Sequence, residues 1–211
     1  MVKIAGEPIV HVLYANVYLK HLIHFEYPEF YILTKIHKPT ITGRPIIFGC
    51  DGPTERISSF VDTLQQPISK IQKSFLKDTT DFINSIENTE VKKRTFLVLM
   101  DVTSLYTNIP QNEGIEIVCK AYENFDKNNP PIPTHYLREM LRLILKENSF
   151  QFNGKPYLQT HGTAMGTKTA VSFANIFMTH IETTILSRTV FKPTVWKRYI
   201  DDIFSLCMRH K

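Results

Sequence analysis

The sequence has 211 residues, a length that suits one domain or two closely packed lobes. Hydrophobic residues make up 43% and charged residues 21%, as is ordinary for a globular protein, and no apolar run approaches the ~20 residues needed to span a bilayer. The net charge of +5 is compatible with a polyanionic partner but excludes little, because many proteins without such a partner share it.

The cysteines and the N-terminus indicate an intracellular protein. Cys50, Cys119 and Cys207 are odd in number and lack the short spacings of a disulfide framework or a zinc site. The first four residues, Met-Val-Lys-Ile, do not begin a signal peptide. We therefore expect an intracellular chain without a disulfide partner and without membrane contact.

The N-terminal third predicts a short lead-in followed by a hairpin and two helices. Residues 1–29 are mixed and have no clear element. Residues 30–33 and 45–48 are β-prone runs on either side of Pro39 and Gly43, which predicts a hairpin with several cations around its tip. These cations are Lys35, His37, Lys38 and Arg44.

Two amphipathic helices are expected next. Thr54 is a plausible N-cap for the first, and Pro67 is expected to end or kink it. Asp78 is a plausible cap for the second. The apolar positions follow helical spacing in both: Ile57, Phe60, Val61 and Leu64 in the first, and Phe82, Ile83 and Ile86 in the second.

Residues 96–100 form a continuous apolar run that stops at Asp101. Its length suits a strand, and its lack of alternation predicts burial on both faces. Two helices should follow, the second capped by Thr134. Their apolar stripes are Ile115, Val118, Cys119 and Tyr122, and then Leu137, Met140, Leu141 and Ile144.

The C-terminal part predicts two more hairpins around a long helix. Asn153-Gly154 between apolar runs is a strong hairpin signal. A glycine-containing stretch, residues 162–166, should open the long helix, and residues 195–206 should fold as strand, tight turn and strand. The predicted stripe of the helix is Val171, Ala174, Met178, Ile181 and Ile185. Hairpins require antiparallel pairing, so we expect an α+β fold.

Three aspartates lie at the ends or turns of the predicted strands. Asp101 ends a predicted strand, and Asp201 and Asp202 occupy the turn of a predicted hairpin within a basic stretch. If the strands are neighbours, the three meet at one rim of a sheet, where their charges repel one another unless cations bind. Mg²⁺ prefers such oxygen ligands, and two ions can serve phosphoryl transfer. The alternative for the Asp-Asp pair is a solvated turn.

Several motifs resemble those of reverse transcriptases, in order. The A, B and C motifs of that class are similar to residues 101–107, 162–168 and 199–202 (Tyr-Ile-Asp-Asp). The residues of these motifs are most similar to those of Penelope-like retroelements, which encode telomerase-related reverse transcriptases. The segments that carry this resemblance are residues 35–38 (Lys-Ile-His-Lys), 44–46 (Arg-Pro-Ile), 104–110 (Ser-Leu-Tyr-Thr-Asn-Ile-Pro) and 164–168 (Ala-Met-Gly-Thr-Lys).

The resemblance runs from about Phe30 to the C-terminus and implies a right-hand polymerase fold. Residues 30–95 would form the fingers and residues 96–211 the palm, whose antiparallel sheet is backed by helices. The thumb, the later palm motifs and the GIY-YIG endonuclease of many such elements would be absent, so we expect a truncated chain. The implied location is nuclear.

The resemblance also implies roles at the reaction centre. Asp101 and Asp201 would bind two Mg²⁺ ions, with Mn²⁺ as an alternative, helped by the main-chain carbonyl of Val102. Asp202 would be a nearby, less essential carboxylate. The partners would be an RNA template, a DNA primer and dNTPs. The residues that hold the triphosphate would be Lys38 and Arg44, assisted by Lys35, although plain surface cations are the alternative.

Three further residues would shape the nucleotide site. The aromatic ring of Tyr106 would pack beneath the sugar and exclude a 2′-hydroxyl, which makes the product DNA; the alternative is a core aromatic. Gly162 and Gly166 would let the backbone approach the template–nucleotide pair, and they also suit a helix-entry turn. The competing functions are a catalytically inactive or domesticated module that binds RNA or a hybrid, and a nucleotide cyclase or other palm-type phosphotransferase.

Overall fold

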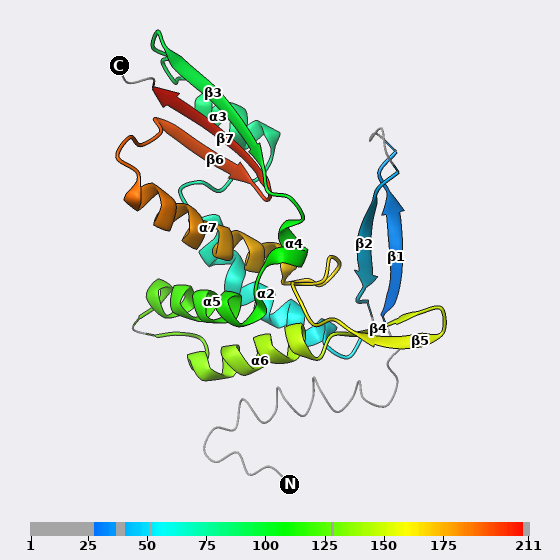
Figure 1. Cartoon of the computed structure of the whole chain (residues 1–211). Coiled ribbons are helices and arrows are strands. Elements are labelled where there is room, and N and C mark those ends of the chain that lie inside the picture. The colour runs from blue at the N-terminus through cyan, green and yellow to red at the C-terminus, as the bar shows by residue number, and fades with distance from the viewer. Residues whose placement is uncertain (1–27, 37–40, 51, 128, 209–211) are drawn as a thin grey trace.

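The fold combines a layer of helices with two sheets, as seen in a computed structural model that describes residues 28–36, 41–50, 52–127 and 129–208. Figure 1 shows a three-stranded sheet at the upper left, helices α2, α5, α6 and α7 below it, and a separate group of four strands to the right. Short helix α4 (Leu105–Asn108) lies between the two sheets. The arrangement confirms the α+β class.

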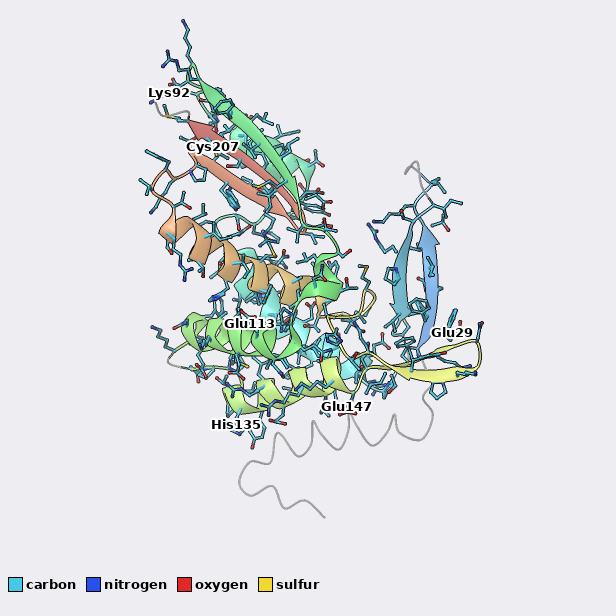
Figure 2. The ribbon with its side chains drawn as sticks, viewed as in Figure 1. Glu29, Lys92, Glu113, His135, Glu147 and Cys207 are labelled. Atoms are coloured by element: carbon cyan, nitrogen blue, oxygen red, sulfur yellow. The ribbon has the colours of Figure 1, made fainter. Side chains whose placement is uncertain are left out.

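The three-stranded sheet is antiparallel with the order β3-β7-β6. Its strands are β3 (Thr95–Asp101), β7 (Asp202–Met208) and β6 (Val195–Tyr199). In this register Asp101 lies opposite Asp202 at one end of the sheet, and Thr95 lies opposite Met208 at the other. Figure 2 shows Lys92 and Cys207 near that second end. The predicted strand–turn–strand around residues 200 and 201 is confirmed.

The prediction that residues 96–100 are buried on both faces is wrong. Phe96, Leu97 and Leu99 are 52%, 62% and 72% exposed. Among the described strands β3 pairs only with β7 and lies at the edge of the sheet. Its side chains are exposed on both faces, so continuous apolar character here does not imply two covered faces. Helix α3 (Thr79–Ile86) lies against β7, where Phe82 meets Phe204 edge-to-face at 5.0 Å between ring centroids.

Helix α7 (Ala170–Arg188) runs through the helical layer and contacts α2 (Glu55–Lys70) and α5 (Gln111–Phe125). Helix α6 (Thr134–Lys146) packs on α5 and α2. The predicted single stripe on α7 is partly wrong, because Val171 and Ile185 are exposed. Neighbours on several sides bury most of the first half of α7, so no single stripe describes it. By contrast, the predicted stripe of α5 is fully buried.

Some of the predicted helix caps are confirmed and others are not. Asp78 caps α3 as predicted, since its side chain accepts a hydrogen bond from the Asp81 N–H. Thr54 is the N-cap of α2 but makes no side-chain cap bond, and Thr134 begins α6 instead of capping it. Pro67 does not end α2, which continues to Lys70, and the Pro67 carbonyl still accepts a hydrogen bond from the Ile71 N–H at 3.3 Å.

The four-stranded sheet has the order β2-β1-β4-β5 and joins two predicted hairpins. Strands β1 (Glu29–Thr34) and β2 (Gly43–Phe48) form the first, and β4 (Ser149–Phe152) and β5 (Lys155–Leu158) the second. Strand β1 meets β4 in a short parallel pairing. Asn153 and Gly154 have φ of 50° and 72°, as a two-residue hairpin turn requires. The lead-in up to residue 27 and the hairpin tip with Lys38 lie outside the described residues.

Candidate active site

The three aspartates lie at one end of the three-stranded sheet. Asp101 is the last residue of β3, and its direct partner across the ladder is Asp202, the first residue of β7. Asp201 is in the turn between β6 and β7, and its carbonyl accepts a hydrogen bond of 3.0 Å from the Val102 N–H. The sheet therefore ties the turn to the end of β3 through main-chain contacts alone.

The turn has a strained residue at its centre. Ile200 has a φ of 55°, in the left-handed region that β-branched side chains rarely adopt. Strain of this kind persists only where surrounding contacts hold it, and it gathers at functional sites. Here the left-handed residue reverses the chain within a two-residue turn, Ile200 and Asp201, so that Asp202 pairs with Tyr199 across the hairpin.

Electrostatics within this cluster is repulsive. Burial, and then the charges of Asp201 and Asp101, raise the pKa of Asp202. In the described part of the chain no side chain donates a hydrogen bond or forms an ion pair to any of the three carboxylates. Hard carboxylate oxygens that lack a protein cation are the ligand set that suits Mg²⁺, so the residue types fit the metal.

The carboxylates are nevertheless divided between two hollows. Asp101 and Asp202 line an apolar groove of about 750 Å³ on one side of the sheet. Asp201 lines a different cleft, of about 510 Å³. Successive residues at a strand end point in opposite directions, which separates Asp201 from Asp202. Among the described residues no group of three or more His, Cys, Asp or Glu side chains is placed to hold one metal ion together.

The second cleft brings together residues from distant parts of the chain. Lys35 and Arg44 come from the β1–β2 hairpin, Tyr106 from α4 (Leu105–Asn108), and Lys168 from the loop before α7. Burial raises the pKa of Tyr106, and the charge of Asp201 raises it further while that of Arg44 lowers it. Of the residues predicted to bind the nucleotide, Lys38 lies outside the described part.

Local backbone structure places Tyr106 in this cleft. Ser104 adopts a left-handed conformation with a φ of 53°, which turns the chain from β3 into the single helical turn of α4. Leu105 and Ile109 are buried in the hydrophobic core on either side of Tyr106, and they anchor the turn. The ring of Tyr106 is half-buried at the cleft wall and also packs against the hydrophobic core, so the structure fits both a nucleotide-site residue and a core aromatic.

The two predicted glycines make close backbone contacts within the protein. Gly162 has a φ of 67°, and a Cβ there would lie 2.5 Å from the Tyr106 carbonyl oxygen. Gly166 has a φ of 117°, and a Cβ there would collide with the Ile47 carbonyl oxygen. The Ile47 N–H also donates to the Met165 carbonyl at 3.0 Å. These contacts with Ile47 join the loop before α7 to strand β2. Of the two glycines, Gly166 lines the cleft and Gly162 does not.

Two basic residues near the site have roles that sequence reasoning missed. Lys168 lines the cleft, and its place in the motif that resembles a B motif was the available signal. Arg198 counts toward the basic stretch around the aspartates, yet it is only 1% exposed and is bonded to interior groups, so its charge does not face a partner. No local pattern distinguishes it from the surface cations nearby.

Comparison with solved structures places the fold among template-directed polymerases. Telomerase from Candida tropicalis, truncated from its C-terminal domain, matches with a TM-score of 0.58 and 10% identity over 95% of this chain and 49% of that one. Telomerase from Candida albicans with a TWJ fragment of telomeric RNA gives 0.61 and 13%, over 94% and 42%. The BmCPV RNA-dependent RNA polymerase at its elongation state gives 0.56 and 10%, over 96% and 20%.

These neighbours show that the chain has the fold of right-hand polymerases, as the sequence predicts. Residues 36–211 match the family described as reverse transcriptase (RNA-dependent DNA polymerase), and the chain belongs to that family. It spans less than half the length of the telomerase chains. Comparison with curated proteins found no significant match.

Two remaining sequence predictions concern cysteines and membranes. Cys50, Cys119 and Cys207 are free thiols, and burial raises the pKa of Cys119 to about 11, so this thiol stays protonated at neutral pH. In the residues that the structure describes, no helix is both long and apolar enough to cross a bilayer.

Proposed function

We propose that this chain is an RNA-directed DNA polymerase, which transfers nucleotides from dNTPs to the 3′-hydroxyl of a primer on an RNA template. The observation that carries the proposal is the cleft in which Arg44, Tyr106 and Asp201 meet from three separate elements. A cation for the triphosphate, a ring for the sugar and a carboxylate at the reacting end are the groups that nucleotidyl transfer needs. Membership of the reverse transcriptase family supports the same reaction.

Each residue has a physical task in this proposal. Arg44 grips the triphosphate with its planar fork, and Lys35 adds a second positive charge. The ring of Tyr106 lies beneath the sugar and excludes a 2′-hydroxyl. Asp101 and Asp201 hold two divalent ions, with Asp202 close to both. When bound, these ions would neutralise the triphosphate and lower the pKa of the primer 3′-hydroxyl.

The source we propose is a Penelope-like retroelement, with Mg²⁺ or Mn²⁺ as the ion and the nucleus as the place of action. The support is the wording of the motifs, above all residues 35–38 and 164–168. In addition, the chain shares its fold with the two telomerases.

A second candidate is a module that binds RNA or a hybrid without catalysis. The observation that favours it is the division of the three aspartates between two hollows, with no group of three metal-binding side chains in the described ranges. The two candidates share the basic cleft but differ in whether bound primer–template is extended.

Primer extension separates them. A labelled DNA primer on an RNA template is incubated with the protein, dNTPs and either Mg²⁺ or Mn²⁺, with a chelator as the blank. The proposal predicts extension that the chelator abolishes. Binding of primer–template without extension in either ion would support the non-catalytic module and contradict the polymerase.

Arg44→Ala then tests the nucleotide site. We expect a KM for dNTP that is roughly ten- to a hundredfold higher, because a charge-assisted bidentate contact contributes about 1.5–3 kcal/mol, with little change in primer–template affinity. Arg138→Ala is the matched control, since Arg138 pairs with Glu116 on the surface of the helical layer. Equal KM values for the two variants would remove Arg44 from the nucleotide site.

A further inference from the structure

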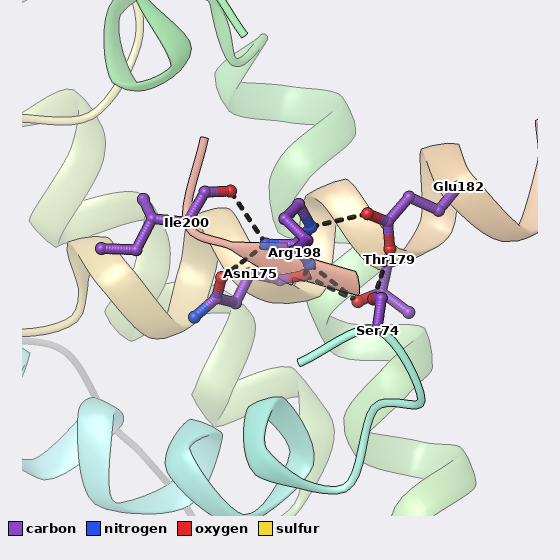
Figure 3. A network of polar contacts seen from close by, with 6 residues as sticks. All are labelled: Ser74, Asn175, Thr179, Glu182, Arg198 and Ile200. Atoms are coloured by element: carbon purple, nitrogen blue, oxygen red, sulfur yellow. Dashed lines mark hydrogen bonds and ion pairs between the residues drawn. The ribbon is translucent and has the colours of Figure 1, made fainter. Parts of the chain in front are cut away.

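A buried polar network adjoins the turn that carries Asp201, and Arg198 of β6 is its centre (Figure 3). The Arg198 Nε donates to Glu182 Oε1 at 2.7 Å. Its Nη1 donates to Asn175 Oδ1 at 2.7 Å and to the Ile200 carbonyl oxygen at 3.0 Å. Its Nη2 donates to the Asn175 carbonyl at 3.1 Å and to Thr179 Oγ1 at 3.3 Å. One side chain thus joins helix α7 to the turn.

The network also reaches the linker between α2 and α3. Ser74 Oγ donates to Glu182 Oε2 at 2.6 Å, so both oxygens of this carboxylate have partners. The Arg198 main chain continues the contact, because its N–H donates to the Ser74 carbonyl and its carbonyl accepts from the Leu76 N–H. Helix α7, the linker and the turn that follows residue 198 are therefore all bonded to Arg198.

Net stability is a poor explanation for this arrangement. The side chains of Arg198 and Glu182 are 1% and 5% exposed, and removing both charges from water costs much of what their attraction returns. Buried ion pairs can often be replaced by apolar side chains without loss of stability. What such a pair does provide is fixed geometry, since a guanidinium holds several acceptors in one plane.

The acceptor that matters for the reaction is the Ile200 carbonyl. It belongs to the peptide group that leads into Asp201, and Ile200 itself is in the left-handed region. The bond from Arg198 Nη1 holds this peptide from one side. The bond from the Val102 N–H to the Asp201 carbonyl holds the next peptide from the other side. Together they set where Asp201 stands relative to the end of β3.

We propose that Arg198 is a positioning residue for Asp201. Through Nη1 it transfers the rigidity of α7 to the turn between β6 and β7, and so fixes the distance from Asp201 to Asp101. This inference rests on the proposed polymerase function only for its catalytic consequence. The structural tie can be measured without nucleotide or metal.

The test compares two substitutions that cut different branches of the network. Arg198→Lys keeps the charge but places one nitrogen where three donate in the network. We expect its ammonium to stay with the Glu182 carboxylate and to lose the Ile200 carbonyl. Thr179→Val is nearly isosteric. It removes an acceptor of Nη2 and the bond of 2.9 Å that Thr179 Oγ1 donates to the Asn175 carbonyl, and it leaves the Nη1 bond to the turn intact. Thr179 is therefore the matched control for loss of a network bond as such.

The first readout is hydrogen exchange of the Val102 amide in the full 211-residue chain, since this N–H is bonded to the Asp201 carbonyl. We expect exchange to be about tenfold faster or more in Arg198→Lys and unchanged in Thr179→Val, because local opening of the turn has its own equilibrium. The Val118 amide in the core of α5 reports global unfolding. Equal acceleration at Val102 and Val118 in Arg198→Lys, or none at either, would overturn the proposal.

The second readout is single-nucleotide incorporation. We expect Arg198→Lys to lower kcat by about a hundredfold, the loss that a misplacement near 1 Å can cause, with an unchanged KM for dNTP. Thr179→Val should retain the wild-type kcat. An active wild type with full kcat in Arg198→Lys would contradict the positioning role. Absence of activity in the wild type would count against the polymerase function. Val102 exchange would still show whether Arg198 holds the turn in place.

Discussion

At the residue scale, the most informative charge is that of Asp202. Burial, and then the two neighbouring carboxylates, raise its pKa, and no cation in the described part of the chain offsets them. A carboxyl whose folded-state pKa is raised destabilises the fold when it is ionised. The penalty is absent below the unfolded-state pKa and develops as the pH rises through the folded-state value.

Asp202→Asn should therefore stabilise the metal-free protein at neutral pH. We expect a gain of at most about 0.2–1 kcal/mol, the usual size of a cross-strand charge pair, because Asp202 is exposed and solvent screens the repulsion. We expect no gain at a pH low enough to protonate both states. Thermal unfolding at several pH values in chelator measures it. Glu90→Gln, at an exposed acidic residue, is the control. A loss of stability at neutral pH would mean that Asp202 has a partner that this account lacks.

Tyr106 decides the choice of sugar in the proposed mechanism. A rigid ring that overlaps a 2′-hydroxyl costs about 1–3 kcal/mol, which corresponds to roughly ten- to a hundredfold discrimination. Tyr106→Ala should admit ribonucleotides while keeping dNTP use, and Tyr106→Phe should keep the selectivity because the ring bulk acts. Competition between dNTP and rNTP in primer extension measures both. Continued rejection of ribonucleotides by the alanine variant would leave Tyr106 a packing residue.

At the element scale, local sequence patterns predicted most helices and strands but did not predict which of their faces are buried. Asn153-Gly154 and the residues around Asp201 reverse the chain through turns of two residues, a signal contained in a short window. Burial of β3 could not be predicted, because the same apolar run serves a central or an edge strand. The mixed burial of α7 likewise depends on neighbours that are remote in sequence.

Gly166 forms a close backbone contact between the loop before α7 and strand β2. Its φ of 117° suits glycine alone, and any Cβ would meet the Ile47 carbonyl. Gly166→Ala should lower the free energy of unfolding by more than about 1–3 kcal/mol, the usual cost of one strained residue. Gly154→Ala is the matched control, because Gly154 also has positive φ but open space around it. Urea unfolding compares them, and equal losses would refute the contact.

At the scale of the whole molecule, the site is assembled from segments that no local pattern joins. Arg44, Tyr106 and Asp201 share a cleft although more than fifty residues separate each from the next. The resemblance of the motifs predicted that these residues lie together, because the same motifs occur in the same order in a family whose fold is known. It did not predict Arg198, whose burial follows only from the packing of α7 against the sheet.

The central claim is that Asp101 and Asp201 form the catalytic centre of an RNA-templated DNA polymerase. The most direct measurement is the rate of a single dNTP addition on an RNA template by the wild type, Asp101→Asn and Asp201→Asn, with Glu90→Gln as the control. Each asparagine variant keeps its size but loses the charge that holds the ion.

The account predicts incorporation by the wild type and the control, and a rate at least about a hundredfold lower in both aspartate variants, with primer–template affinity retained. A wild type without incorporation in Mg²⁺ or Mn²⁺, or an Asp201→Asn protein as fast as the wild type, would contradict it.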